Sequence, residues 1–220
     1  TFDKLNFLTE KIIVQHSRKA YSNKGIAACI KYENNFFLRH LNLKKKDVIE
    51  FGCGAFPSSL GIKKEKWPKN FIATDTSPKV LKIAKSFDRR PIYKIINLEK
   101  KIKLNKKFDY LIIKGVLHHT KNPTKILSQL KRYLKKDGAI IISEPNLSSI
   151  LGNLLKWFFR YFFNYSMETS PYGQYSYKKI SSSVKRAKLR IEKKWYSVLI
   201  LLPLSGNYGR IKILPDSLIL

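Results

Sequence analysis

The chain has 220 residues, 44% of them hydrophobic, so it is long and apolar enough to fold around a core and is not a disordered polypeptide. Its 44 Lys and Arg residues against 15 Asp and Glu residues give a net charge of +29, which attracts nucleic acid, acidic lipid headgroups or phosphorylated substrates, although a solvated basic surface without a partner has the same composition. Two cysteines, Cys29 and Cys53, supply neither a disulfide framework nor a multi-cysteine zinc site, and the opening residues lack a signal-peptide pattern, so a cytoplasmic protein is expected.

Apolar residues at helical spacing predict a helical cap at the N-terminal end. Leu5, Leu8 and Ile12 share one face of an expected helix over residues 2–16. A second helix is expected over residues 26–41. We therefore assign residues 1–43 to an N-terminal helical cap.

Short apolar blocks alternate with helical patterns from residue 47 onward, and they define the predicted core, residues 44–146. The expected strands cover residues 48–51, 70–74, 91–96, 108–114 and 139–143, and the expected helices cover residues 77–87 and 123–134. A turn is expected at residues 136–138, after the second of these helices. Such alternation is typical of a doubly wound, mostly parallel α/β sheet that is covered on both faces.

The alternation stops after residue 146. Residues 147–165 form a very apolar and aromatic segment with a narrow polar stripe, which predicts an amphipathic helix. A Tyr-rich loop and a basic helix over residues 178–188 follow, so residues 147–189 read as a helical insertion after the fifth strand. Residues 190–220 are expected to supply C-terminal strands, the first over residues 190–200, to what we interpret as a single domain.

Two glycines follow the first predicted strand directly, in the sequence DVIEFGCGAFPSS. Gly52 and Gly54 allow a sharp turn and a close approach of a ligand to the backbone. A dinucleotide fingerprint G-x-G-x-x-G fails here, because Pro57 stands at its third glycine. Glu50 would repel a pyrophosphate and attract an amino group, whereas Asp75, at the end of the second strand, can accept both hydroxyls of a ribose. The alternatives are a plain tight turn and an Asp75 that caps the next helix.

These blocks resemble those of class I S-adenosylmethionine-dependent methyltransferases, which have a Rossmann-like fold. The similar sequences are IEFGCGAF, IATDTSPKVLKIA, INLEKKI, FDYLIIKGVLHHT and LSQLKRYLKKDGAIIISEPN, in family order. The resemblance implies S-adenosylmethionine as the cofactor, bound by the glycine turn, by the acidic residue after the second strand and by residues after the third and fourth strands. In this chain those positions are Glu50, Gly52, Cys53, Gly54, Asp75, Thr76, Asn97, Leu98, Lys114 and Val116.

Two residues depart from the family pattern. Phe56 stands where a third glycine is common, and its ring would either narrow the cofactor pocket or line the acceptor side. Lys114 stands where relatives have a small or neutral residue. A non-catalytic protein of the same fold is therefore an alternative to an active enzyme.

Methyl transfer from a sulfonium needs no metal, and it needs a base only when the acceptor must lose a proton. His118 and His119 follow the fourth predicted strand and are the candidate bases, with His119 preferred by resemblance. Either histidine can instead pack under its loop. Tyr21, Phe56 and Glu144 are candidates for the acceptor side.

The acceptor class stays open, with one preference. The chain lacks the D-P-P-Y or N-P-P-Y sequence of enzymes that methylate base amino groups, and its GVLHHT resembles the branch that acts on small molecules, lipids and sugars. The segment Leu151–Tyr165 could bury itself as a lid or lie on an anionic membrane surface, which would suit a lipid-linked acceptor. RNA binding through the basic helix is the alternative.

Overall fold

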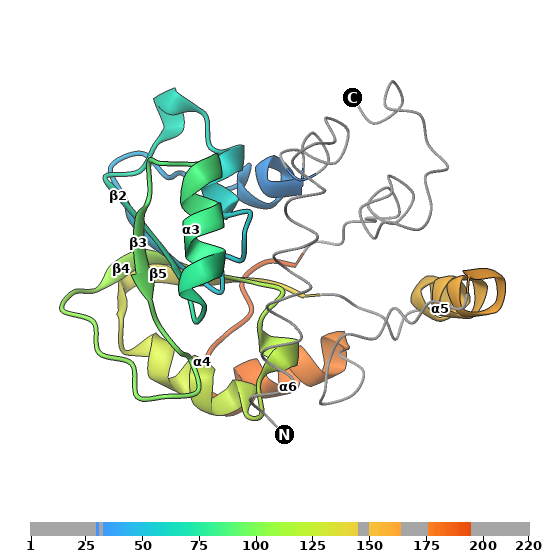
Figure 1. Ribbon diagram of the computed structural model, residues 1–220. Helices are drawn as coiled ribbons and strands as arrows, with labels where there is room; N and C mark the ends of the chain where they lie inside the picture. Colours follow the sequence, from blue (N-terminus) through green and yellow to red (C-terminus); the bar gives the residue numbers. More distant parts are fainter. Residues whose placement is uncertain (1–29, 31–32, 145–149, 164–175, 195–220) are drawn as a thin grey trace. The chain divides into compact units, whose positions relative to one another are not determined.

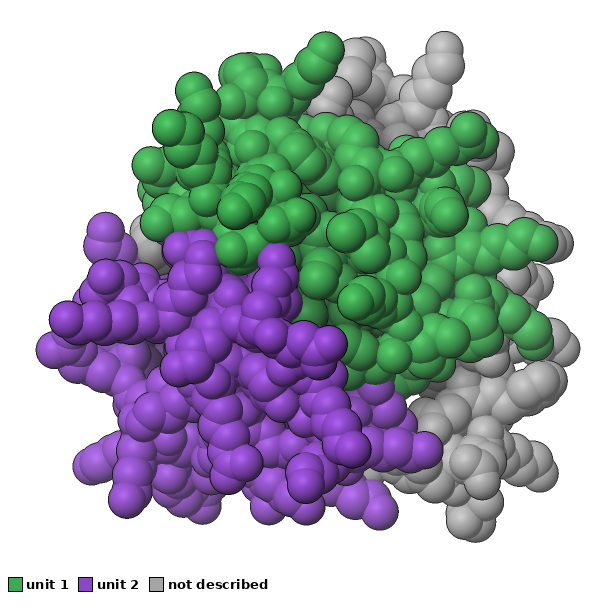
Figure 2. Space-filling view, turned by 90° about the vertical axis from the view of Figure 1, so that its left-hand side faces the viewer, with its two compact units in different colours: residues 1–96, 195–220 green, residues 97–194 purple. Residues whose placement is uncertain are grey.

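The computed structural model describes residues 30, 33–144, 150–163 and 176–194 (Figure 1). The chain divides into two compact units, residues 1–96 with 195–220 and residues 97–194, which are coloured separately in Figure 2. Ile30 and residues 33–38 are helical, in agreement with the second helix of the predicted cap. The first predicted helix and Tyr21 lie outside the described residues.

The described residues of the first unit include three parallel strands and one long helix. Strand β1 (Asp47–Phe51) pairs with β2 (Asn70–Asp75), and β2 pairs with β3 (Ile92–Ile95). Helix α3 (Pro78–Phe87) packs against β2 and β3, and two short 3-10 helices, η1 (Ser58–Gly61) and η2 (Lys64–Lys66), connect β1 to β2. The residues at the carboxyl ends of β1 and β2 thus come from this unit.

The second unit contains two strands and the remaining helices. Strand β4 (Phe108–Lys114) pairs in parallel with β5 (Leu134–Ser143). Between them lie the short η3 (Leu117–His119) and α4 (Pro123–Lys131). Helix α5 (Ile150–Phe163) follows β5, and α6 (Tyr177–Arg186) packs against α4.

The five strands belong to one sheet with the order β3-β2-β1-β4-β5, and the pairings within each unit are parallel. This order is that of a doubly wound α/β sheet, so the predicted Rossmann-like, mostly parallel fold is confirmed. Strands β1 and β4 are the most deeply buried, with Ile49, Phe51, Leu111 and Ile112 inaccessible to solvent. Strand β3 forms one edge and leaves the side chains of Ile92 and Ile95 52% and 62% exposed.

Side-chain caps fix where the core helices begin. Ser77 accepts a hydrogen bond from the amide of Val80 at the start of α3, and Asn122 accepts one from the amide of Lys125 at the start of α4. In both helices a proline follows the cap, where its missing amide costs nothing. The caps therefore set both helix starts within one residue of those predicted.

Two sequence predictions were wrong within the described residues. The turn expected at residues 136–138 lies inside β5, which begins at Leu134, because the strand bends past β4 with an irregular register between Phe108 and Tyr110. Gly138 is needed there for close approach, since a Cβ would lie 2.9 Å from the Phe108 carbonyl oxygen. Residues 190–194 are not a strand, and the rest of that predicted strand lies outside the described residues.

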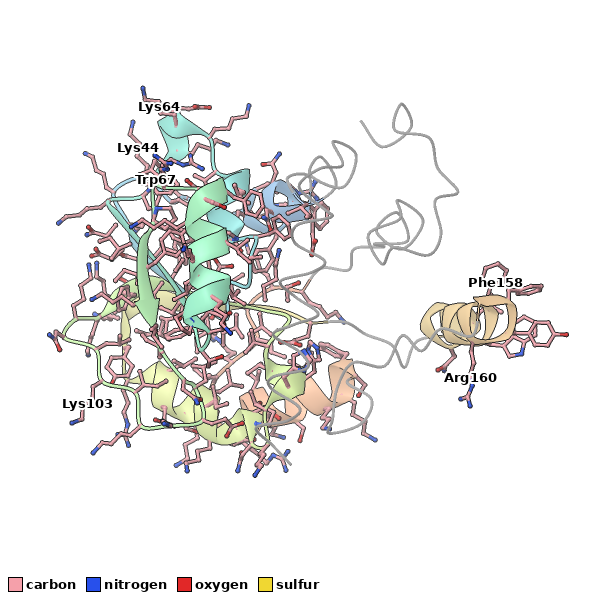
Figure 3. All side chains as sticks on the ribbon, in the orientation of Figure 1. Lys44, Lys64, Trp67, Lys103, Phe158 and Arg160 are labelled. Atoms are coloured by element: carbon pink, nitrogen blue, oxygen red, sulfur yellow. The ribbon has the colours of Figure 1, made fainter. Side chains whose placement is uncertain are left out.

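Helix α5 carries a row of exposed aromatic side chains. Trp157 is 58% and Tyr161 72% exposed, and the two rings stack with centroids 5.5 Å apart. Phe158 and Phe162 pack with centroids 4.9 Å apart on the same helix. Figure 3 shows Phe158 and Arg160 projecting from opposite sides of α5. In the described part of the chain, no helix is both long and apolar enough to cross a bilayer.

Gly61→Ala is expected to lower the free energy of unfolding by about 1–3 kcal/mol, as overpacking does elsewhere. A Cβ at this position would lie 2.6 Å from the Asn35 amide nitrogen and 2.7 Å from the Asn34 carbonyl carbon, and backbone atoms cannot move aside cheaply. Urea denaturation measures the change. Lys82→Ala, at an exposed position of α3, is the control and should shift stability by less than about 0.5 kcal/mol. Equal effects of the two substitutions would contradict the packing argument.

Candidate active site

The bend after β1 is held in the left-handed region of backbone conformation. Gly52 has φ of 65° and Gly54 has φ of 59°, values that glycine adopts without strain. Between them, the Cys53 amide donates a hydrogen bond of 2.8 Å to the carbonyl of Thr74 in β2. A Cβ at Gly54 would meet no atom within 4 Å, so the bend faces open space on that side. The glycine is required by the backbone angle, and the open side leaves room for a ligand.

Glu50, at the end of β1, is fully buried and anchors the loop that follows the bend. Its two carboxylate oxygens accept hydrogen bonds of 3.1 and 2.9 Å from the Ser58 amide, and the Ser58 hydroxyl donates to the same carboxylate. Burying a carboxylate is costly unless such donors satisfy it. Holding η1 in place is therefore the role of Glu50 that the geometry displays, and contact with a cofactor amino group stays a prediction.

A second buried carboxylate secures the same loop from α3. Asp88 accepts hydrogen bonds from the Ser59 hydroxyl at 2.7 Å and from the Arg90 guanidinium at 2.8 and 2.9 Å. Burial alone would raise the pKa of Asp88, but the donors from Arg90 and Ser59 outweigh it, and the pKa lies below its ordinary value. Arg90 also donates to the carbonyls of Ile62 and Ser59. The loop between β1 and β2 is thus fixed along its length.

Asp75, at the end of β2, is half-buried beside the glycine bend. One carboxylate oxygen accepts a hydrogen bond of 3.1 Å from the Gly54 amide, and the other accepts one of 3.1 Å from the Ser77 amide. Burial raises the pKa of Asp75, and these amide donors only partly offset it. Asp75 therefore connects the bend to the start of α3, so the helix-capping role that the sequence offered as an alternative is present. The Asp75 side chain also remains partly open to solvent.

The neighbours of the bend differ in accessibility. Burial raises the pKa of the Cys53 thiol far above its usual range, with Glu50 and Asp75 adding to the effect, so the thiol is inert as a nucleophile. Thr76 is exposed. The Phe56 ring packs against Ile30 and lies with its centroid 5.0 Å from that of Phe87.

In the second unit, Glu144 accepts hydrogen bonds from the turn that follows β4 and stabilises it. Its Oε1 accepts hydrogen bonds from the amides of Val116 at 2.9 Å and Leu117 at 2.7 Å. Its Oε2 lies 2.6 Å from His118 Nδ1, and the Glu144 side chain is inaccessible to solvent. A carboxylate that accepts from two amides leaves Nδ1 of His118 as the donor of the third bond. The second ring nitrogen, Nε2, is then the proton-accepting atom of a neutral imidazole.

His118 and His119 lie side by side but differ in environment. Their ring centroids are 3.9 Å apart, and His118 is buried while His119 is at the surface. Desolvation of the imidazole by the surrounding residues and the adjacent His118 lower the pKa of His119 to about 4, against a smaller opposing effect of Glu144. His119 is therefore neutral near pH 7, and it is a weak base.

The remaining predicted cofactor residues of the second unit lie at strand ends. Asn97 accepts a hydrogen bond of 2.8 Å from the Glu99 amide, and Leu98 is buried. Lys114 is the last residue of β4 and is half-buried, like Val116. Their contacts with a nucleoside stay predictions.

Sequence reasoning missed the residues that hold the loops. Ser58, Ser59, Asp88 and Arg90 were not singled out, and the paired serines directly after Pro57 were the available signal, since small hydroxyl side chains suit buried carboxylates. The carboxylate of Glu144 was assigned to the acceptor side, whereas its observed contacts are with the η3 turn. The two strand-end acids thus share a structural role that their positions alone did not reveal.

The residues of the first unit fit S-adenosylmethionine. The glycine bend offers open space at Gly54, where a ligand can approach the protein backbone closely. The partly exposed carboxylate of Asp75 lies next to it. The carboxylates of Glu50 and Asp75 close to the bend would repel the phosphates of a dinucleotide. An acidic and phosphate-free cradle suits a cationic nucleoside better than a dinucleotide.

Comparison with known proteins agrees with this assignment. The methyltransferase-domain family matches residues 25–182. The tRNA U34 carboxymethyltransferases of Aliarcobacter butzleri and Sulfurimonas denitrificans are 34% and 32% identical over 119 and 120 residues, which cover 51% of this chain and 38% of each relative. The chain thus matches well under half the length of these relatives.

The fold is also that of solved methyltransferases. An S-adenosylmethionine-dependent methyltransferase from Mesorhizobium loti superposes with a TM-score of 0.56 at 13% identity, over 81% of this chain and 88% of that one. At this identity the likeness establishes the fold alone. The family match spans most of the chain and includes the glycine bend, Asp75 and the η3 turn. The chain belongs to the methyltransferase-domain family, with S-adenosylmethionine as the cofactor that this membership indicates.

Proposed function

We propose that this domain transfers a methyl group from S-adenosylmethionine to an RNA. The observation that carries the choice of acceptor is the similarity to two proteins named tRNA U34 carboxymethyltransferase, at 34% and 32% identity. The sequence favoured a small-molecule, lipid or sugar acceptor because of its GVLHHT segment, with RNA as the alternative. The named relatives now favour that alternative.

The charge of the chain supports an RNA acceptor. A net charge of +29 generates a field that concentrates polyanions and speeds their encounter with the protein. A free sugar or a neutral lipid gains nothing from this field. RNA carries one negative charge for each nucleotide, so it gains the most.

In the proposed complex, the first unit holds the cofactor. Gly52 and Gly54 bring the backbone close to the methionine part, Asp75 accepts the ribose hydroxyls, and Glu50 keeps the bend in position through Ser58. S-adenosylmethionine supplies a methyl group activated by its sulfonium, and the contribution of the protein is orientation and exclusion of water. A cationic ligand near Asp75 would also offset the free-energy cost of keeping that half-buried carboxylate charged.

His118 is the proposed proton acceptor for an acceptor atom that carries a proton. Glu144 holds the Nδ1 side of the ring at 2.6 Å, so Nε2 is the ring nitrogen that would take the proton, and Glu144 stabilises the imidazolium that forms. The sequence preferred His119. His118 is favoured because Glu144 orients its ring, and the pKa of about 4 makes His119 a weak base.

A second candidate acceptor is lipid-linked. The exposed aromatic row of α5, with Trp157, Phe158, Tyr161 and Phe162, is the specific observation in its favour. Aromatic rings favour the boundary between headgroups and acyl chains, and Arg160 on the other side of α5 suits anionic headgroups. This candidate predicts association with the surface of a bilayer.

Asp75→Asn is expected to weaken S-adenosylmethionine binding by about 10- to 100-fold, because the ribose and the cationic ligand lose a charged acceptor. Since burial raises the pKa of Asp75, the affinity of the native protein should fall on acidification at a higher pH than an ordinary aspartate would give. Calorimetry at a series of pH values measures both effects. The exposed Asp137→Asn is the control. Undiminished affinity of the Asp75 variant would refute the ribose role.

His118→Ala is expected to lower kcat by about 100-fold or more at an unchanged affinity for the cofactor, since a positioned base contributes about 10²–10⁴-fold. His119→Ala should retain activity within a few-fold. Initial rates across a pH range, with each purified variant, measure the effect. If only the His119 variant loses activity, and the activity of the native protein stays level down to about pH 4, then His119 is the base and not His118.

Transfer of label from methyl-labelled S-adenosylmethionine tests the acceptor. The native protein is incubated separately with unmodified tRNA, with a lipid extract and with a sugar pool, and Asp75→Asn is the control in each case. Ribonuclease-sensitive label in the tRNA is expected. If label appears in the lipid fraction instead, and the double variant Trp157→Ser/Tyr161→Ser reduces it, the lipid-linked acceptor is established and the RNA acceptor is overturned.

A further inference from the structure

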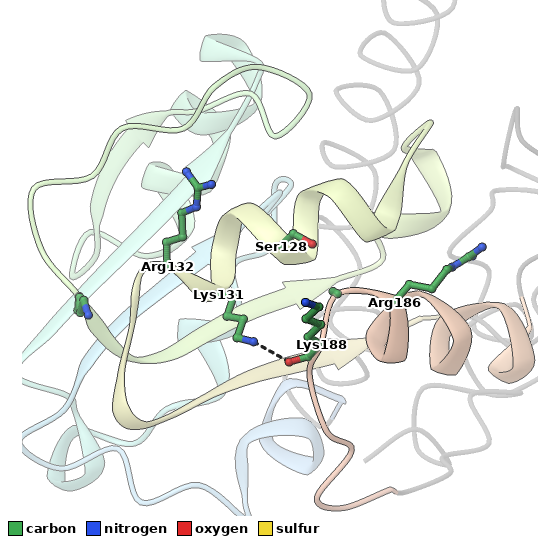
Figure 4. A pocket seen from close by; sticks show the side chains of 7 residues that line it. Ser128, Lys131, Arg132, Arg186 and Lys188 are labelled. Atoms are coloured by element: carbon green, nitrogen blue, oxygen red, sulfur yellow. Dashed lines mark hydrogen bonds between the residues drawn. The ribbon is translucent and has the colours of Figure 1, made fainter.

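A shallow open groove of about 490 Å³ lies where α4 and α6 meet, within the second unit. Five of its seven lining residues are cationic, and none is acidic: Lys107, Ser128, Lys131, Arg132, Arg186, Ala187 and Lys188. Figure 4 shows the labelled side chains coming from α4 and from the C-terminal end of α6. The groove contains none of the residues that the sequence marked for the cofactor, and it includes the end of the basic helix that the sequence offered as an RNA-binding alternative.

The two sides of the groove are joined by a defined contact. Lys131 Nζ donates a hydrogen bond of 2.6 Å to the Lys188 carbonyl oxygen. Lys188 has φ of 54°, which turns the chain at the end of α6 and brings its carbonyl to Lys131. The Leu189 amide bonds back to the carbonyl of Val184 and completes this turn. The cationic side chains therefore stand on a fixed backbone.

Neutralisation of helix ends does not account for this charge. Lys131, Arg132 and Arg186 lie at the C-terminal ends of α4 and α6, where each helix carries about half a negative charge. Two such ends offset about one positive charge of the five. Among the described residues, none of Lys107, Arg132, Arg186 and Lys188 forms an ion pair. A large uncompensated positive charge remains in the groove.

We infer that this groove binds the phosphate backbone of RNA. Lysine, arginine and serine are the side chains that contact phosphate oxygens, and Ser128 adds a hydroxyl donor among the cations. None of the described lining residues is aromatic, so this part of the groove offers bases no stacking platform and we expect binding that does not depend on sequence. The inference deepens the proposed function and rests on it, because it names the surface that would hold the RNA acceptor.

The test compares two triple variants that each remove three positive charges. K107Q/R132Q/R186Q alters the groove, whereas K44Q/K64Q/K103Q alters three lysines outside it, which are labelled in Figure 3. Fluorescence anisotropy follows binding of a labelled oligouridylate and of transcribed tRNA over a range of salt concentrations. Unfolding midpoints and S-adenosylmethionine affinities of both variants check that each is folded.

The groove variant should bind RNA about 10- to 100-fold more weakly near physiological salt, and its plot of log K against log salt should be shallower by about 2, the value for three lost phosphate contacts. The control variant should change affinity by less than about threefold. Equal losses in both variants would overturn the groove, as would cation-dependent binding to anionic vesicles without binding to RNA. Because oligouridylate need not be methylated, failure of label transfer to tRNA would count against the proposed function and leave this measurement interpretable.

Discussion

A buried carboxylate at the end of β1 is the contact on which the proposed cofactor site depends. Glu50 has no access to solvent, and its oxygens are satisfied by the amide and hydroxyl of Ser58. A carboxylate in this position cannot be left without donors, so the chain after the bend has to return to it. The chain bends at Gly52 and Gly54, which both have positive φ, before it reaches Ser58. The Glu50 contact therefore holds the loop that follows the open side of Gly54.

The second unit uses the same construction at another strand end. Glu144, just after β5, accepts hydrogen bonds from the amides of Val116 and Leu117 and from the ring of His118. In both units an acidic side chain organises a turn by satisfying backbone amides that helices and strands do not use. Glu144 serves a further purpose, because its third contact selects the tautomer of His118. The Glu144 carboxylate thus both stabilises the turn and orients the proposed base.

Much of the fold could be predicted because its signals are local. The buried run of β4 and the capped starts of α3 and α4 are encoded within a few residues of each element. The start of β5 was missed because Lys136-Asp137-Gly138 has the composition of a turn, and only the partner strand reveals that Gly138 is needed for close approach. Tertiary contacts overrode local preference there.

The candidate site was predictable in its residue types but not in its contacts. The glycine spacing and the acid 25 residues after Glu50, Asp75, pointed to the ends of β1 and β2, where the Gly54 amide donates a hydrogen bond to Asp75. That Glu50 binds Ser58, and that Glu144 binds His118, depends on loops whose path no periodic pattern records. The preference between the two histidines likewise depends on the contact between Glu144 and the His118 ring, which the sequence of two adjacent histidines cannot reveal.

The exposed edge of the sheet has a consequence for association between copies of the chain. Among the described strands, none pairs with the outer side of β3, which presents Ile92 and Ile95 to solvent. Such an edge invites another strand to add to it, and two features oppose this: the strand has only four residues, and Lys94 lies between the isoleucines. Like charges on neighbouring copies would repel one another. Salt screens this repulsion, so strand addition between copies at this edge should become easier as the ionic strength rises.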